Sequence, residues 1–363
     1  MLNQTITSIL PLLELLQQPA FCIHDEQTIH SNAAARNLAP RNAAQLSDWL
    51  GSAAVLYASW ERTSPLEIST QILGSTYSVT MQPLVDGTLF LLTEQPLNEI
   101  TDAFLAVASQ VLRQPLTQLS VLVQQSVQNP DPDQMQPRYA AMTRQIYQLS
   151  RITGNLADLP QLHNGTYRLH PEMKDIAAGL EPILTELESL SEISGRTFQW
   201  KLPTKPLMLQ ADFPLLERAI LNLVSNAMKF ATQGTPILLQ AEEHGNYLLI
   251  RVRNQCTESR AELLRAAFSR LEQRNQIPDP RWGVGLGLPI AQYIARLHGG
   301  MVAVEATERG DVTVTMSILR RFQSKNPVLM SASLPFEYNG GMRRTLMELS
   351  EILPNHLFTK DAL

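Results

Sequence analysis

Two stretches of the sequence decide the fold of its second half: Leu221–Phe230, which reads LNLVSNAMKF, and Trp282–Gly300, which reads WGVGLGLPIAQYIARLHGG. In the first stretch, Asn222, Asn226 and Lys229 recur at i, i+4 and i+7, so a helix places two amides and an ammonium on one face. An amide oxygen is a reasonable ligand for hydrated Mg²⁺, and a lysine one turn later can reach a phosphate. A polar face on an ordinary amphipathic helix fits these three residues equally well.

The second stretch places glycines directly before a helix expected at 286–297. Gly283, Gly285 and Gly287 let the backbone approach a phosphate closely, and the helix N-terminus supplies unpaired N–H groups. Taken alone, such a glycine pattern is often only a flexible turn. It differs from the dinucleotide-binding fingerprint, because no predicted strand directly precedes it.

Together, and in this order, the two stretches resemble the ATP-binding domain of two-component sensor histidine kinases. The first is similar to the N box of that family and the second to its second glycine box, while AAFSRL at 266–271 is similar to the phenylalanine box between them. The resemblance covers about residues 172–320 and implies an α/β-sandwich ATP-binding domain of the GHKL type, with ATP and Mg²⁺ as cofactors and Asn226 as the Mg²⁺ ligand. The implied nucleotide-binding residues are Asn222, Asn226, Lys229, Phe230, Asn254, Gly283, Gly285, Leu286 and Gly287.

The first glycine box departs from the family pattern D-x-G-x-G, because residues 254–258 read NQCTE. Asn254 keeps an acceptor oxygen, and its NH₂ group can pair with an adenine ring nitrogen, so the change from aspartate need not abolish adenine binding. Cys256 and Glu258 add side chains where glycines let the backbone pack close to the base, and Glu258 adds negative charge. We therefore expect weakened ATP binding, with the N box and residues 283–287 still competent.

Residues 96–168 predict a hairpin of two long amphipathic helices. Apolar residues recur at spacings of three and four from Ile100 to Leu122 and from Tyr139 to Leu159, and the segment NPDPDQMQP at 129–137 breaks the pattern. One hairpin leaves much of each apolar stripe exposed, whereas two hairpins paired in an antiparallel four-helix bundle cover it. The sequence therefore predicts a homodimer.

The first helix of the hairpin carries SQVLRQPL at 109–116, which resembles the phosphoacceptor pattern S-H-E-L-R-x-P-L of the same family. Gln110 stands at the position of the reacting histidine, and Val111 stands at the position of the following acid. A glutamine amide nitrogen is not a nucleophile, because its lone pair is delocalised, and valine cannot act as a base. No histidine occurs between His30 and His163, so a small shift of the alignment restores nothing. The resemblance therefore predicts a degenerate member, a pseudokinase without an intact catalytic acceptor.

Residues 1–95 are predicted to form a mixed α/β unit in which a short helix ends before Pro19 and Asp86-Gly87 forms a hairpin turn. This unit resembles a PAS sensor domain, and the main local cue is Asn32-Ala33-Ala34. The predicted division of the chain is a PAS-like domain at 1–95, the hairpin at 96–168, the ATP-binding domain at 169–322 and a tail at 323–363. A helix expected at Met342–Leu353 packs on the protein's own surface or docks a partner.

Composition narrows the class of protein further. The chain has 363 residues, a net charge of −5 and a pI of about 5.8, which argues against a broadly basic nucleic-acid binder. Charged residues make up 17% of the chain, and ten of the 39 residues from Gln110 to Gln148 are glutamine. The N-terminus lacks the features of a signal peptide, and no apolar run approaches the roughly 18 residues of a membrane span. We therefore expect a cytoplasmic protein.

Three functions follow from these patterns. The leading prediction is a dimeric signalling protein that binds ATP weakly, does not autophosphorylate at Gln110, and engages a response regulator or another kinase. The second is an active ATP-dependent kinase that phosphorylates a partner or a non-standard acceptor, as the intact N box and second glycine box suggest. The third is a purely structural interaction module, motivated by the two departures and the tail. Whether phosphotransferase activity is retained stays open.

Overall fold

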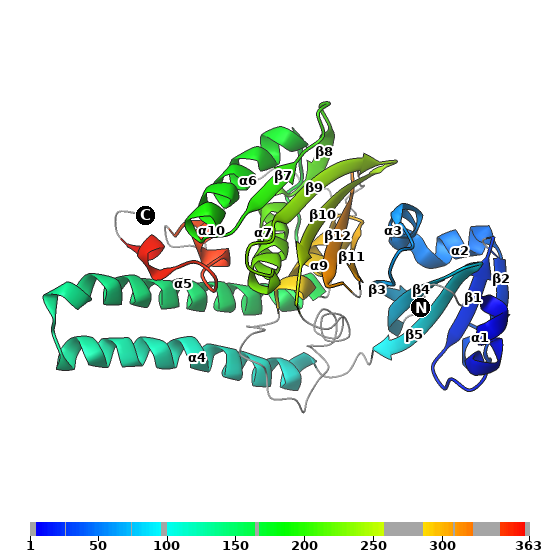
Figure 1. Cartoon of the computed structure of the whole chain (residues 1–363), viewed down its shortest axis with the longest axis horizontal. Coiled ribbons are helices and arrows are strands. Elements are labelled where there is room, and N and C mark those ends of the chain that lie inside the picture. The colour runs from blue at the N-terminus through cyan, green and yellow to red at the C-terminus, as the bar shows by residue number, and fades with distance from the viewer. Residues whose placement is uncertain are drawn as a thin grey trace.

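The structure is a computed structural model. This structure describes residues 5–25, 27–73, 75–95, 100–163, 167–257, 286–307, 309–321 and 342–359. Within these ranges the chain is a mixed α/β structure, with an N-terminal α/β unit, a long helical hairpin and a C-terminal α/β unit (Figure 1). None of the helices formed by these residues is long and apolar enough to cross a membrane.

The N-terminal unit is built on antiparallel strands in the order β2-β1-β5-β4-β3. Its elements are α1 (Ile6–Leu13), β1 (Ala20–His24), β2 (Gln27–Ser31), α2 (Ala43–Leu50), α3 (Ala54–Ser59), β3 (Leu66–Ile72), β4 (Ser75–Leu84) and β5 (Gly87–Gln95). The hairpin predicted around Asp86-Gly87 is confirmed, because Leu84 pairs with Gly87 and the two strands stay in register beyond it. Stacked rings of Phe21 and Phe90, with centroids 4.8 Å apart, lie in the core of this unit.

The hairpin consists of α4 (Ile100–Gln128) and α5 (Pro132–His163). The break between them is narrower than the predicted 129–137. Pro132 begins α5, where the missing proline N–H costs no hydrogen bond, and Pro137 lies only one turn further on. Arg138 donates from Nη1 to the carbonyl oxygens of Gln125 (3.0 Å) and Asn129 (2.7 Å), and so closes the end of α4 against the start of α5.

The C-terminal unit packs helices on one face of a sheet with the strand order β11-β12-β10-β9-β7 (Figure 1). Its elements are β6 (Glu172–Asp175), α6 (Ile176–Ile193), β7 (Phe198–Lys201), β8 (Met208–Ala211), α7 (Phe213–Phe230), β9 (Ile237–His244), β10 (Tyr247–Gln255), α9 (Gly287–Leu297), β11 (Met301–Ala306) and β12 (Asp311–Leu319). The sequence of residues 172–193 favours a single helix, and this prediction is wrong over the first turn. Residues 172–175 pair with β8 instead, and Asp175 caps α6 by accepting from the Ala177 N–H (3.0 Å).

The two α/β units share one continuous sheet. Strand β3 of the N-terminal unit pairs antiparallel with β11, so that Glu67 lies opposite Val304. Beside this junction Arg296 of α9 donates from Nη2 to the Ser69 carbonyl oxygen (3.0 Å). The pairing satisfies the backbone groups of both edge strands, and it ties the N-terminal unit directly to the C-terminal one.

The C-terminal segment forms α10 (Arg344–Glu348), a turn and the 3₁₀ helix η4 (Asn355–Phe358). It lies between α5 on one side and α6 and α7 on the other (Figure 1). The helix predicted over 342–353 is therefore shorter than expected. Four apolar side chains of this segment are buried in the core of the C-terminal unit: Leu346, Leu349, Leu353 and Phe358. Of the two alternatives for the tail, the structure shows packing on the protein's own surface.

Candidate functional site

Helix α7 carries the three polar residues of the N box, and its start is fixed by a cap. Asp212 Oδ1 accepts a hydrogen bond from the Leu215 N–H (3.2 Å), as is typical of an N-cap aspartate. The Asp212 N–H donates in turn to Nε2 of His298, at the end of α9 (3.0 Å). Burial lowers the pKa of His298, which favours the neutral ring that can accept this bond. This hydrogen bond thus holds the N-terminal end of α7 against the C-terminal end of α9.

Asn222 is fully buried where α7 meets the first turn of α9. Its Nδ2 donates to the Arg218 carbonyl oxygen (2.9 Å), while its Oδ1 finds no hydrogen-bond partner among the described residues. A Cβ added to Gly287 would lie 2.7 Å from this Oδ1, so only glycine allows the two helices to approach this closely. Leu286 is buried just before α9, and its carbonyl oxygen accepts from the Ile290 N–H (3.0 Å).

The other N-box residues lie further along α7, toward its C-terminal end. Asn226 and Phe230 are half-buried, and the Lys229 ammonium lies 5.9 Å from the centroid of the Phe230 ring. The same ammonium lies 3.4 Å from Oε2 of Glu351, in the C-terminal segment. The structure therefore brings Asn222, Asn226 and Lys229 to one helix, as predicted, and places the tail against it.

The altered first glycine box lies at the end of β10, where Asn254 is buried opposite Val312 of β12. Asn254 donates from Nδ2 to Sγ of Cys256 (3.0 Å), and the Cys256 side chain is itself part of the core. The Cys256 N–H donates to the Gly310 carbonyl oxygen (2.7 Å). The two substituted positions thus contact each other, and one of the two N–H donors of the Asn254 amide is used in this contact. Gly283, Gly285, Glu258 and the segment 266–271 lie outside the described residues.

Two glutamates of the C-terminal segment face the N box, and the sequence did not single them out. Glu348 is only 1% exposed, and its Oε2 lies 3.1 Å from Nε of Arg151 on α5. Asn222 donates from Nδ2 to the same oxygen (3.4 Å), and Oε1 lies 3.7 Å from Nε of Arg218. Glu351 contacts Lys229 and also lies 3.6 Å from Nη1 of Arg151.

Arg218 joins α7 to the hairpin as well as to the tail. Its guanidinium donates to Oδ2 of Asp158 (2.6 Å) and to Oδ1 of Asn155 (2.7 Å), both on α5. These contacts bring three cations, Arg151, Arg218 and Lys229, together with three carboxylates, Asp158, Glu348 and Glu351. Without the two carboxylates of the tail, the same group would hold three cations against one carboxylate. Such a surplus of positive charge next to buried amides suits a polyanion.

Comparison with known proteins gives a family for this arrangement. Residues 211–321 match the family of histidine kinase-, DNA gyrase B- and HSP90-like ATPases. Sensor protein KdpD of Escherichia coli K12 is 28% identical over 212 residues, 56% of this chain and 23% of KdpD. Histidine protein kinase DivJ of Caulobacter vibrioides is 27% identical over 222 residues, 59% of this chain and 36% of DivJ. The chain is a homologue of two-component sensor histidine kinases.

This histidine kinase homologue spans only part of its relatives. Sensor histidine kinase WalK of Bacillus subtilis is 24% identical over 246 residues, which cover 64% of this chain and 40% of WalK. Among solved structures, Acinetobacter baumannii histidine kinase AdeS overlaps 58% of this chain and 98% of its own, at 19% identity and a TM-score of 0.45. A TM-score of that size says nothing of how the parts of the chain are arranged.

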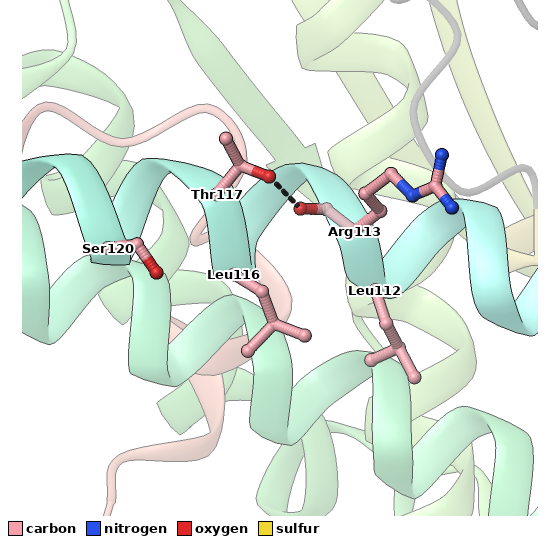
Figure 2. A pocket seen from close by; sticks show the side chains of 5 residues that line it. All are labelled: Leu112, Arg113, Leu116, Thr117 and Ser120. Carbon is pink, nitrogen blue, oxygen red and sulfur yellow. Dashed lines mark hydrogen bonds between the residues drawn. The ribbon is translucent and has the colours of Figure 1, made fainter.

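In this histidine kinase homologue, Gln110 and Val111, the residues predicted to stand at the acceptor position, lie inside α4. Just beyond them α4 borders an open hollow lined by Leu112, Arg113, Leu116, Thr117 and Ser120 (Figure 2). Thr117 donates from Oγ1 to the Arg113 carbonyl oxygen (2.8 Å), and Leu112 and Leu116 point to the opposite side of the helix (Figure 2). Two leucine side chains, together with polar ones, therefore line a hollow on α4 next to Gln110.

Proposed function

We propose that this chain is a degenerate sensor histidine kinase homologue that binds MgATP weakly, does not autophosphorylate on α4 and acts as a dimeric signalling partner. The observation that carries the proposal is Gln110, an amide at the position where the family pattern has the reacting histidine. Val111 follows it where the pattern has an acid, so both the nucleophile and its assisting base are missing. Bound ATP would supply a transferable phosphoryl group, but this helix offers no side chain at that point to receive it.

The C-terminal unit carries the types of side chain that bind a magnesium nucleotide. Asn226 is proposed as the Mg²⁺ ligand and Lys229 as a phosphate contact, with the unpartnered oxygen of Asn222 beside Gly287 as a further polar group. The remaining proposed nucleotide contacts are Phe230, Asn254, Gly283, Gly285 and Leu286. Asn254 supports weakened binding, because one of the two N–H donors of its amide already donates to Cys256, which restricts how the amide can turn toward an adenine.

The exposed apolar side chains of the hairpin support the proposed four-helix bundle. Leu116 of α4 and Ile146 of α5 are each about half exposed, and Val127 near the hairpin turn is 75% exposed. Pairing with a second hairpin would remove these side chains from water. Sedimentation at micromolar concentration is the test: a dimer is expected, and a strict monomer contradicts the bundle.

The proposed division into a PAS-like domain at 1–95, a hairpin at 96–168 and an ATP-binding domain at 169–322 follows from the same family resemblance. A response regulator or another kinase is the proposed partner, because the relatives that this chain matches are sensor kinases. The cytoplasmic location stays a prediction.

Calorimetric titration of the full chain with MgATP tests nucleotide binding. We expect measurable but weak binding that is lost in Asn226→Ala, since that change removes the proposed metal ligand. Gln199→Ala, which removes an exposed amide on β7, is the matched control and should bind as the unaltered chain does. Affinity in the micromolar range or tighter contradicts weakened binding, and no heat at millimolar nucleotide contradicts binding altogether.

A further inference from the structure

The C-terminal segment contacts Asn222 and Lys229, two of the α7 residues that are proposed to bind a magnesium nucleotide. Glu348 accepts from Nδ2 of Asn222, and its carbonyl oxygen accepts from Oγ of Ser225 (3.5 Å). Glu351, one turn later, contacts the Lys229 ammonium. Two carboxylates therefore cover the first and last of the three predicted N-box residues from one side.

The chemistry of these carboxylates is close to that of a polyphosphate. Each presents anionic oxygens to guanidinium and ammonium groups, the pairing that phosphates also make. A phosphate chain and the two carboxylates would repel each other strongly at such separations, because little water is left to screen them. Simultaneous occupation of this face by the tail and by nucleotide phosphates is therefore unfavourable.

The same segment also contacts α5 of the hairpin and so links α7 to it. Arg144 of α5 donates to the carbonyl oxygens of Ser350 (2.7 Å) and Glu351 (2.8 Å), and to Oδ1 of Asn355 (3.0 Å). The rings of Tyr147 on α5 and Phe358 meet edge to face at 5.3 Å. Release of the tail from α7 would thus remove many of the contacts that hold the C-terminal unit against α5.

We propose that residues 344–358 act as an internal competitor of MgATP, with Glu348 and Glu351 standing in for nucleotide phosphates on α7. Nucleotide binding then requires the tail to leave α7, and this release also loosens the C-terminal unit from the hairpin. The inference rests on the proposed function, because it assumes that the N box holds MgATP. A tail that only completed the core would stabilise the fold but would not compete.

Glu351→Gln is the sharpest variant for a test by MgATP titration. Glu351 is partly exposed, and the apolar anchors Leu349 and Leu353 on the same segment stay in place, so the fold is retained. Removing its charge should tighten MgATP binding roughly tenfold, because the partly buried ion pairs of Glu351 with Lys229 and Arg151 no longer hold the tail on α7. Glu192→Gln, an equal change of charge at an exposed site on α6, should bind MgATP as the unaltered chain does.

Amide hydrogen exchange on the unaltered chain gives a second readout that needs no variant. Competition predicts that MgATP speeds exchange in residues 342–359, since the nucleotide favours the released tail. A purely structural tail predicts unchanged or slower exchange there. Exchange that stays unchanged or slows at saturating MgATP overturns the proposal.

The outcomes separate the two proposals. Equal MgATP affinity of the unaltered chain and Glu351→Gln overturns the competing tail and leaves nucleotide binding intact. If the unaltered chain, Glu351→Gln and Glu192→Gln all fail to bind MgATP, the proposed nucleotide binding is wrong, and so is the proposed competition by the tail. Tighter binding in Glu351→Gln, together with faster exchange of the tail in MgATP, is the result that the proposal requires.

Discussion

Replacing Glu348 with glutamine should release the C-terminal segment from α7 and α5. The change keeps the shape of the side chain and removes its charge. The Glu348 carboxylate is 1% exposed, and its closest charged partner, Arg151, is only 7% exposed. Glutamine at this position leaves the Arg151 guanidinium buried without its nearest counter-ion, which is the costly way to break such a pair.

The size of the effect follows from the remaining contacts. Removing one partner of a buried ion pair costs about 3–5 kcal/mol. The lower end applies here, because Arg218 keeps its bonds to Asp158 and Asn155, and Arg151 keeps Glu351 at 3.6 Å. A cost of about 3 kcal/mol corresponds to roughly a hundredfold change in the equilibrium between the bound and released segment.

Amide hydrogen exchange measured by mass spectrometry reports this equilibrium directly. The Leu349 and Leu353 N–H groups donate to the carbonyl oxygens of Thr345 and Leu349, each at 3.0 Å, and exchange when the segment opens. In Glu348→Gln these amides should exchange roughly a hundredfold faster, while those of β10 and β12 and the whole Glu192→Gln control stay unchanged. Exchange within about threefold of the unaltered chain would refute the reasoning, since it would mean that the buried pair contributes almost nothing.

Three further predictions concern packing and pH. Leu349→Ala removes a fully buried side chain and should destabilise the tail by about 2–5 kcal/mol, seen in the same exchange experiment; unchanged exchange of residues 342–359 would contradict this. Gly287→Ala should lower the melting temperature, at a cost of about 1–3 kcal/mol from overpacking on Asn222; Gly154→Ala on α5, where a Cβ meets nothing within 4 Å, should not lower it, and equal effects would count against the close approach of α7 and α9. Burial raises the pKa of Glu305 on β11 to about 7, so the folded state binds this proton more tightly than the unfolded chain, and the stabilisation is lost as pH rises through that value. Glu305→Gln should therefore raise the melting temperature at about pH 8 but not at about pH 5, and the reverse order would contradict the assigned burial.

Capping and turn residues in the sequence indicate the ends of those helices and strands that are fixed by residues adjacent in the chain. Asp212 caps the start of α7 through a residue type that favours this position, and Asp86-Gly87 was correctly predicted to form the turn of the β4–β5 hairpin. Residues 172–175 were misread as helix because their strand depends on pairing with β8, more than thirty residues later in the chain. The pairing of β3 with β11 has no local signal either, because it joins segments from opposite ends of the chain.

The same distinction explains what the sequence predicted of the candidate site. The helical spacing of Asn222, Asn226 and Lys229 is a local property and predicted their common helix. The contacts of Glu348 are not local, because its partners come from α5 and α7 and meet it only in the folded chain. The one available signal was the i, i+3 spacing of Glu348 and Glu351 in an amphipathic tail, and that spacing alone is equally typical of a solvated helix face.

The central claim is that this chain binds nucleotide without transferring phosphate to its own α4. The most direct test incubates Glu351→Gln, in which the site is opened, with ATP labelled on the γ-phosphate, and then maps any label by proteolysis under conditions that preserve phosphohistidine and phosphoamides. The account predicts that the variant binds MgATP while residues 100–128 stay unlabelled. Label on a peptide that contains Gln110 would contradict it.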